Sequence, residues 1–154
     1  MTMSIAIGAD DAAVGLKELL IAHLQSTNYE VTDYSNDCGV KNPIYPDIAW
    51  TVAMAIKDKK HTRGILLCGT GIGMNIVANK VEDIRSAQCH DTFSAERARK
   101  SNDAQIITMG ARVIGPELAK KILDAWLTAE FEGGASLPKV EKISHYEQAS
   151  KISE

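Results

Sequence analysis

Apolar positions along the chain alternate between short runs, which are typical of buried strands, and longer stretches with helical spacing. The short runs predict strands over Met3–Ala9, Glu30–Tyr34, Ile65–Leu67, Asp83–Gln88 and Ala104–Met109. The remaining pattern predicts helices over Ala12–Ser26, Ile48–Lys59, Ile72–Lys80, Thr92–Lys100, Pro116–Glu130 and from about Pro138 onward. Strands that alternate with helices favour a parallel sheet covered on both faces. We therefore predict an α/β fold, a three-layer doubly wound sandwich of the Rossmann-like or flavodoxin-like kind, with five parallel strands in the order 2-1-3-4-5.

Length and composition are those of an ordinary globular protein. The 154 residues show no linker, repeat or low-complexity segment, so residues 1–154 are expected to form one domain. A net charge of −3 gives no sign of a nucleic-acid or membrane surface. No apolar run approaches the roughly 20 residues that span a bilayer, and the N-terminus lacks the features of a signal peptide. Three cysteines without a Cys-x-x-Cys pair favour reduced thiols and a cytoplasmic location.

The segment Gly64–Lys80 carries the most chemistry, because a buried strand runs into a glycine turn that opens a helix. Glycines at Gly69, Gly71 and Gly73 allow a sharp turn and a close approach to a ligand. Unpaired N–H groups at a helix start attract an anion. Cys68 lies at the mouth of this predicted anion site, where a stabilised thiolate could act as base or nucleophile. The alternative is a small buried core residue.

The predicted topology brings further polar residues to the same edge of the sheet. Ligands of doubly wound sheets bind beyond the carboxyl ends of the strands, where the chain reverses direction. Asp10 and Asp11 end the first strand, Cys68 ends the third, and Cys89 and His90 end the fourth. A metal site at Cys89 and His90 is not expected, because adjacent strand residues point to opposite faces.

Two other classes of site fit the glycine turn poorly. A cysteine phosphatase loop needs Cys-x5-Arg, and the residue at the arginine position is Met74. A dinucleotide-binding loop needs Gly-x-Gly-x-x-Gly, and the third glycine, Gly73, comes one residue early. The sequence therefore favours neither class.

The stretch Cys68–Asn75, followed by Ala78–Lys80, resembles the core motif of the type B ribose-5-phosphate isomerases, a family that includes the galactose-6-phosphate isomerase subunits. The family's order and spacing extend over residues 4 to 143, through Gly8–Asp10, Tyr45–Asp47, Ile84–Arg85, Cys89–Asp91, Asn102–Asp103, Gly110–Gly115 and Glu130–Gly134. The resemblance implies an aldose–ketose isomerase that works through a cis-enediolate. Such an enzyme needs no metal and no organic cofactor.

The resemblance also implies roles for the matching residues. Cys68 would be the general base, and Thr70 would pass a proton between the two enediolate oxygens. Asp10 would bind sugar hydroxyls, with a helix N-cap as its alternative role. Asn102 and Arg112 match family positions near the sugar and the phosphate. The alternative role of Asn102 is that of a turn residue, and that of Arg112 is a surface ion pair. The expected substrate-binding residues are Asp10, Asp11, Gly69, Gly71, Ile72, Gly73, Met74, Asn75, His90, Asn102, Arg112 and Lys139.

Three departures from the family pattern concern ring opening and phosphate binding. The strand-one histidine of the family is Asp11, whose carboxylate would repel phosphate unless it is protonated or turned away. The histidine before Asn102, which helps to open a furanose ring, is Ser101, and His90 is a candidate replacement. The phosphate clamp has lost one arginine, and its remaining cation, Lys139, lacks the arginine fork.

We predict interconversion of ribose 5-phosphate and ribulose 5-phosphate as the main activity. Because the departures spare the base and the turn, isomerisation of another sugar phosphate is an alternative. Candidates are erythrulose 4-phosphate and erythrose 4-phosphate, which cannot close a normal five-membered ring, or a hexose 6-phosphate. An alternative of another class is a non-catalytic sugar-phosphate-binding subunit.

By resemblance, the protein forms a homodimer or homotetramer whose sites lie at the subunit interface. The C-terminal helical tail, about residues 135–154, would then pack on a partner subunit. Asn102, Arg112 and Lys139 are candidates to serve the partner's pocket, and the sequence leaves open which subunit they serve.

Overall fold

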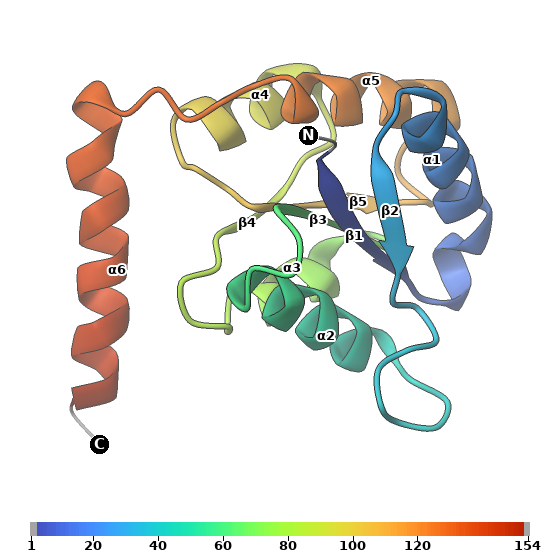
Figure 1. Ribbon diagram of the computed structural model, residues 1–154, viewed down its shortest axis with the longest axis horizontal. Helices are drawn as coiled ribbons and strands as arrows, with labels where there is room; N and C mark the ends of the chain where they lie inside the picture. The colour runs from blue at the N-terminus through green and yellow to red at the C-terminus, as the bar shows by residue number, and fades with distance from the viewer. Residues whose placement is uncertain (1–2, 153–154) are drawn as a thin grey trace.

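Parallel strands form one five-stranded sheet in the computed structural model, which describes residues 3–152 (Figure 1). The strands are β1 Ser4–Ala9, β2 Glu30–Asp33, β3 Arg63–Cys68, β4 Ser86–Gln88 and β5 Ile106–Gly110. Within the described residues, the α-helices are α1 Val14–Ser26, α2 Tyr45–Lys57, α3 Ile72–Ala78, α4 Thr92–Lys100, α5 Pro116–Leu127 and α6 Leu137–Ile152. Two short 3-10 helices, η1 Asp11–Ala13 and η2 Gly134–Ser136, precede α1 and α6. The predicted α/β class and parallel sheet are confirmed.

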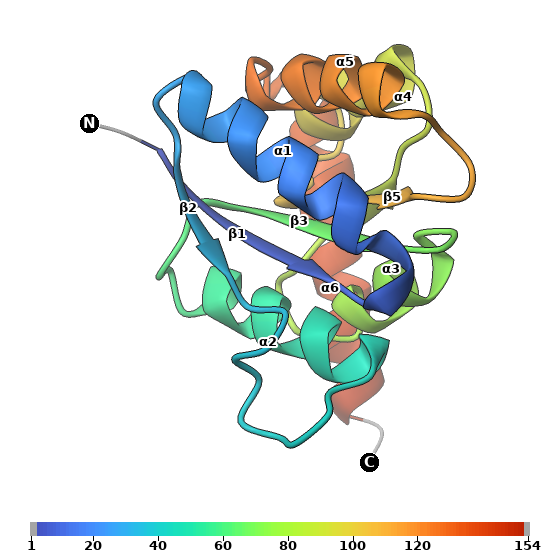
Figure 2. The same cartoon turned by 90° about the vertical axis from the view of Figure 1, so that its right-hand side faces the viewer.

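Helices cover both faces of the sheet, with α1, α4 and α5 on one face and α2 and α3 on the other (Figures 1 and 2). Side chains of a strand alternate between the faces. Accordingly, Ile65 and Leu67 of β3 belong to the core under α1, α4 and α5, whereas Leu66 and Cys68 belong to the core under α2 and α3. The alternation along β3 therefore places the Cys68 side chain on the α2 and α3 face.

The strand order is β2-β1-β3-β5-β4, so the predicted order 2-1-3-4-5 is wrong for the last two strands. β5 pairs with β3 up to the register Cys68↔Gly110, and β4 lies outside β5 at the edge. β5 is buried along its whole length, whereas all three residues of β4 are at least partly exposed. Continuously buried strands occupy the centre of a parallel sheet, and short polar strands suit its edge. The end of β5, rather than the end of β4, therefore borders Cys68.

A buried arginine anchors the first residue of β3. Arg63 is 2% exposed, and its guanidinium donates to the carbonyl oxygens of Trp126, Leu127 and Ala129 at 2.8–2.9 Å. It also pairs with the carboxylate of Glu130 at 2.8 Å. These bonds satisfy carbonyl groups at the end of α5, which have no partner within the helix. The strand that carries the glycine turn is thereby fixed to the helix layer.

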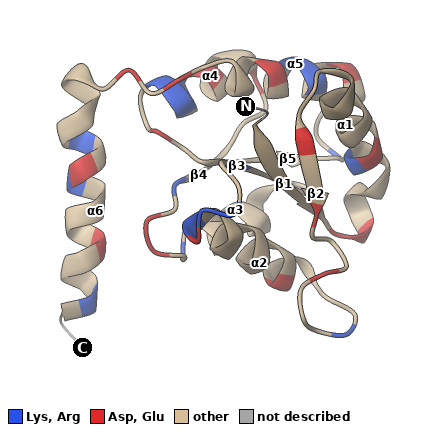
Figure 3. Cartoon of the chain, in the orientation of Figure 1, with Lys and Arg blue, Asp and Glu red and all other residues tan. Residues whose placement is uncertain are grey.

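The C-terminal helix α6 stands beside the β4 edge instead of covering the sheet (Figure 1). Charges of both signs are interspersed along it (Figure 3). Val140 is the one buried residue of α6, and its other large apolar side chains are at least 44% exposed: Leu137, Ile143, Tyr146 and Ile152.

Polar contacts tie α6 to the loop between α3 and β4. Glu82 in that loop pairs with Lys151 at 2.6 Å and with Lys57 of α2 at 3.2 Å. Hydrogen bonds from Lys151, Gln148 and Lys57 lower the pKa of Glu82 to about 2. Within residues 3–152, no helix is both long and apolar enough to cross a membrane.

Candidate active site

The turn after β3 packs backbone to backbone on the end of β5. Gly71 has a φ of +78°, and a Cβ there would lie 2.9 Å from the carbonyl carbon of Met109. A Cβ on Gly110 would lie 2.6 Å from the Cα and the carbonyl carbon of Thr70. Thr108 Oγ1 donates to the carbonyl of Gly71 at 2.8 Å. Both glycines are needed, because any side chain would push the turn away from β5.

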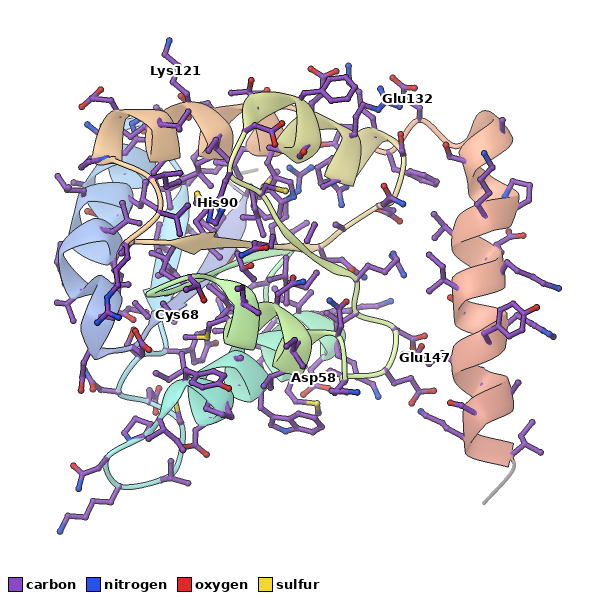
Figure 4. The ribbon with its side chains drawn as sticks, turned by 180° about the vertical axis from the view of Figure 1, so that it is seen from behind. Asp58, Cys68, His90, Lys121, Glu132 and Glu147 are labelled. Atoms are coloured by element: carbon purple, nitrogen blue, oxygen red, sulfur yellow. The ribbon has the colours of Figure 1, made fainter. Side chains whose placement is uncertain are left out.

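The thiol of Cys68 lies inside this turn, on the α2 and α3 face (Figure 4). The residue is 6% exposed, and the N–H of Gly71 donates to Sγ at 3.0 Å. The carbonyl of Cys68 accepts the N–H of Ala111 at 2.9 Å, which fixes the end of the strand. A backbone N–H that points at the sulfur stabilises negative charge on it. The position suits a group that takes up and returns a proton.

Further hydrogen-bond donors follow Cys68 in the turn and at the start of α3. The hydroxyl oxygen of Thr70 accepts the N–H of Ile72 at 3.2 Å, so its own proton is available to a ligand. Gly73 and Met74 follow in the first helical turn, where N–H groups have no acceptor within the helix. The Met74 side chain is fully buried, so this residue can reach a ligand only through its backbone.

Two side chains of the edge strand β4 brace the turn from outside. Gln88 Nε2 donates to the carbonyl of Thr70 at 2.8 Å. Ser86 Oγ donates to Asn75 Oδ1 at 2.7 Å. The predicted site residue Asn75 therefore has its side-chain oxygen engaged with β4.

The exposed side chains of Arg112 and Tyr45 lie against the turn at Gly69 and Gly73, where the glycines have no side chain of their own. A Cβ on Gly69 would lie 3.4 Å from Arg112 Cδ and 3.6 Å from its Nε and Nη1. The structure thus brings Arg112 to the Cys68 turn of its own chain. A Cβ on Gly73 would lie 2.4 Å from the ring of Tyr45. Sequence reasoning did not select Tyr45, although its signal was the Tyr45–Asp47 segment of the family pattern.

A polar cavity of about 710 Å³ opens beside the end of β1, between the start of α1 and the loop before α2. Asp10 and Asp11 line it. The N–H of Asp10 donates to the carbonyl of Leu67 at 3.2 Å, which places Asp10 next to the residue before Cys68. Asp10 Oδ1 also accepts the N–H of Ala12 at 3.0 Å, so the alternative N-cap role is present as well.

A buried lysine supports the residue before Asp10. Lys17 is 5% exposed and pairs with Asp33 at 2.8 Å. Asp33 accepts the hydroxyl of Ser35 at 2.6 Å, and Ser35 Oγ accepts the N–H of Ala9 at 2.9 Å. Burial would raise the pKa of Asp33, but the hydrogen bonds from Lys17 and Ser35 outweigh it and lower this pKa below its usual value. Sequence reasoning did not identify this network.

His90 does not approach the thiol, because it lies on the other side of the sheet from Cys68 (Figure 4). Its Nε2 accepts the N–H of Gly110 at 2.9 Å, so the ring braces the end of β5. Burial raises the pKa of the neighbouring Cys89 thiol to about 12. Within residues 3–152, no three His, Cys, Asp or Glu side chains are grouped to hold a metal ion.

Asn102 and Lys139 also lie away from the Cys68 turn. Asn102 follows α4 and precedes β5, whose last residue, Gly110, borders Cys68. Since a strand rises about 3.3 Å per residue, the five residues of β5 separate its two ends by about 13 Å. Lys139 lies on α6, which stands off the β4 edge. Within one chain, neither side chain joins the thiol.

Comparison with known proteins identifies the family. The sequence profile of a family described as Ribose/Galactose Isomerase matches residues 5–143. The chain belongs to the ribose/galactose isomerase family. It is therefore a sugar-phosphate isomerase of this family, as the sequence motifs predicted.

Relatives of this isomerase family align along almost the whole chain. D-erythrulose-4-phosphate isomerase of Pectobacterium atrosepticum is 68% identical over 97% of this chain and 98% of the relative. Ribose-5-P isomerase B of Listeria innocua is 52% identical over 97% of this chain and all of the relative. The structure of Clostridium thermocellum ribose-5-phosphate isomerase B superposes with a TM-score of 0.91 at 42% identity, covering 96% of this chain and 99% of that chain.

The isomerase fold thus divides the residues predicted for the site into two groups. One group meets around the turn after β3 or beside it at the end of β1: Asp10, Asp11, Cys68, Gly69, Thr70, Gly71, Ile72, Gly73, Met74, Asn75 and Arg112. The other group lies elsewhere in the same chain: His90, Asn102 and Lys139.

Proposed function

We propose that this isomerase interconverts erythrulose 4-phosphate and erythrose 4-phosphate through a cis-enediolate, with Cys68 as the general base. The proposal of Cys68 as base is supported by the position of its thiol in the glycine turn, where Sγ lies 3.0 Å from the Gly71 nitrogen. The relative at 68% identity is D-erythrulose-4-phosphate isomerase, whereas the ribose-5-P isomerase relative is 52% identical. These comparisons favour the tetrose phosphate, our sequence-based alternative, over ribose 5-phosphate.

The proposed reaction moves one proton between neighbouring carbons. The thiolate of Cys68 removes a proton from C1 of the ketose, and the electron pair of that C–H bond forms the enediolate. N–H groups of the turn hold the negative oxygen, and the hydroxyl of Thr70 passes a proton from the C1 oxygen to the C2 oxygen. The thiol then returns its proton to C2, which leaves the aldehyde at C1.

Charge around the turn supports one orientation of the substrate. Asp10, Asp11 and Glu18 line the cavity at the end of β1, where the ammonium of Lys17 is paired with Asp33 at 2.8 Å. The guanidinium of Arg112 lies at Gly69 on the β5 side. Carboxylates accept hydrogen bonds from hydroxyl groups but repel phosphate. The hydroxyl groups are therefore proposed to face Asp10 and the phosphate to face Arg112.

The departure at Ser101 supports the same substrate class. A tetrose 4-phosphate has no free hydroxyl that closes a five-membered ring, so a site for it needs no ring-opening histidine. The hydroxyl of Ser101 instead accepts hydrogen bonds from the guanidinium of Arg97.

Initial rates on a panel of sugar phosphates test this proposal. The panel holds erythrulose 4-phosphate, ribose 5-phosphate and galactose 6-phosphate, with product measured by chromatography. We expect kcat/KM to be about tenfold or more higher for the tetrose than for the pentose, since one carbon unit is worth roughly 10- to 200-fold. A higher kcat/KM on ribose 5-phosphate would contradict the tetrose assignment. Binding without turnover would favour the non-catalytic subunit.

We also propose that two copies of the chain complete each site. Asn102 is separated from its own thiol by the length of β5, and exposed apolar side chains of α6 stand beside the free edge of β4. A second copy packed on this side would cover the apolar side chains of α6. Asn102 of the first copy would then lie near the Cys68 turn of the second copy.

Mixing two inactive variants tests the shared site. Cys68→Ser and Asn102→Ala, each homogeneous, are expected to lose most activity. In a two-fold dimer that assorts randomly, half of the pairs are mixed and each has one intact site, so activity should recover to about 25% of wild type. A mixture no more active than its components would contradict sharing of Asn102. A mixture of Cys68→Ser with Cys68→Ala is the matched control, which should stay inactive.

A further inference from the structure

A second cavity, of about 680 Å³, runs along the free edge of β4 between α4 and α6. Its lining includes Gln88, Ser94, Arg97, Asn102 and Glu147. Gln88 also donates to Thr70, so one wall of this cavity adjoins the glycine turn, while Asn102 lies at the far end of α4.

Arg97 differs from the other cations of this region in lacking a carboxylate partner. Arg85 and Arg99 each pair with Asp103, at 3.3 and 3.1 Å. Lys100 pairs with Glu96 at 3.3 Å. Among residues 3–152, the partner found for the Arg97 guanidinium is the uncharged hydroxyl of Ser101. Among the described residues, the positive charge of Arg97 therefore faces the cavity with no carboxylate paired to it.

Ser101 fixes the orientation of this charge. Nε and Nη2 of Arg97 both donate to Ser101 Oγ, with 2.9 Å from Nε. Two N–H groups on one acceptor hold the planar guanidinium in place, and the N–H groups on Nη1 remain for a ligand.

A second donor in the same cavity strengthens the case for an anion. The backbone carbonyl of Asn102 accepts from Arg85, but its side-chain amide has no hydrogen-bond partner among the described residues. The carboxylate in the lining, Glu147, accepts the N–H of Asp83 at 3.1 Å. Ser94 and Gln88 donate to Asp91 and to Thr70, respectively. The unengaged groups are thus a guanidinium and an amide, which together match a phosphate monoester.

We propose that Arg97, oriented by Ser101, binds the phosphate group of the substrate together with Asn102, alongside Arg112 of the copy that supplies the Cys68 turn. The inference rests on the proposed function, because this cavity adjoins a Cys68 thiol only in the proposed dimer, in which the second copy supplies the Cys68 turn. Arg97 then contributes its positive charge and the N–H groups on Nη1, which Ser101 leaves unengaged. Ser101, which orients Arg97, stands where the family pattern has its ring-opening histidine, so a substrate that needs no ring opening suits this pair.

Phosphate affinity and kinetics of Arg97→Met test the proposal. Binding of inorganic phosphate and of erythrose 4-phosphate is measured by calorimetry on a Cys68→Ser background, where turnover does not interfere. We expect Arg97→Met to weaken both affinities about tenfold or more, since it removes a charge-assisted hydrogen bond. In the active enzyme KM should rise by a similar factor while kcat changes little. Arg97→Lys should recover part of the affinity.

Lys121→Met is the matched control, because it removes the same charge from an exposed position of α5 (Figure 4). Equal phosphate affinity and equal KM for Arg97→Met and Lys121→Met would overturn the proposal, even if the enzyme turns over tetrose phosphates. Conversely, Arg97-dependent phosphate binding in a protein that isomerises no sugar phosphate would uphold this site and refute the proposed function. Thermal unfolding of each variant shows whether it is folded.

Discussion

Replacing Cys68 with serine is expected to lower kcat about 1,000-fold or more, because a general base contributes roughly 10²–10⁴ and a serine hydroxyl is not ionised at neutral pH. The fold should persist, since a serine oxygen can accept the N–H of Gly71 that Sγ now accepts at 3.0 Å. KM should change little, because the turn and the flanking residues Asp10 and Arg112 remain. Steady-state kinetics with erythrulose 4-phosphate, together with thermal unfolding, measure both effects.

Cys38→Ser is the matched control. Cys38 is half-buried before α2, where its thiol donates to the carbonyl of Tyr34 at 3.0 Å, and the mechanism does not use it. We expect near-normal kcat for this variant. A Cys68→Ser enzyme that kept most of its kcat would remove the thiol from the role of base.

Adding one methyl group at Gly110 is expected to reduce kcat about 100-fold or more, the loss typical when a donor to an oxyanion is displaced. A Cβ there would overlap the backbone of Thr70 at 2.6 Å, and backbone cannot move aside as a flexible side chain can. The turn must therefore shift away from β5, which moves its N–H groups relative to Sγ. Overpacking of this kind also costs about 1–3 kcal/mol of folding free energy. Kinetics and chemical unfolding of Gly110→Ala measure the two losses.

Gly115→Ala provides the comparison for Gly110→Ala. A Cβ on Gly115 would meet nothing within 4 Å, and its φ of −83° suits any residue. This variant should keep normal kcat and stability. Normal kcat in Gly110→Ala as well would show that the close packing of turn on strand does not position the donors.

Much of the fold was predictable because local patterns dictate it. The apolar run of β3 between two glycines and the spacing in α1 and α5 needed no tertiary information. The order of β4 and β5 was mispredicted, although the contrast between Ser86–Gln88 and Ile106–Gly110 carried the signal. Polarity selects the edge strand, whereas the sequence-based order followed the succession of strands in the chain.

The candidate site was predictable where it depends on strand ends and glycines. Cys68 and Asp10 meet because carboxyl ends of parallel strands share one edge of the sheet. Contacts that depend on side-chain reach were not predictable, such as the packing of Tyr45 on Gly73 or the link from Lys17 to Ser35. His90 shows the reverse error. It follows β4 at the predicted edge of the sheet, but it accepts a backbone N–H on the side of the sheet opposite the thiol.

Proton exchange in D2O, followed by proton NMR, tests the central claim most directly. Purified protein is incubated with erythrulose 4-phosphate, with ribose 5-phosphate and Cys68→Ser as parallel samples. We expect deuterium uptake at the carbon beside the carbonyl together with formation of the aldose, fastest for the tetrose and absent in Cys68→Ser. Isomerisation without deuterium uptake from solvent would point to direct hydride transfer, and unchanged exchange in Cys68→Ser would mean that another group is the base. Either result would contradict the account.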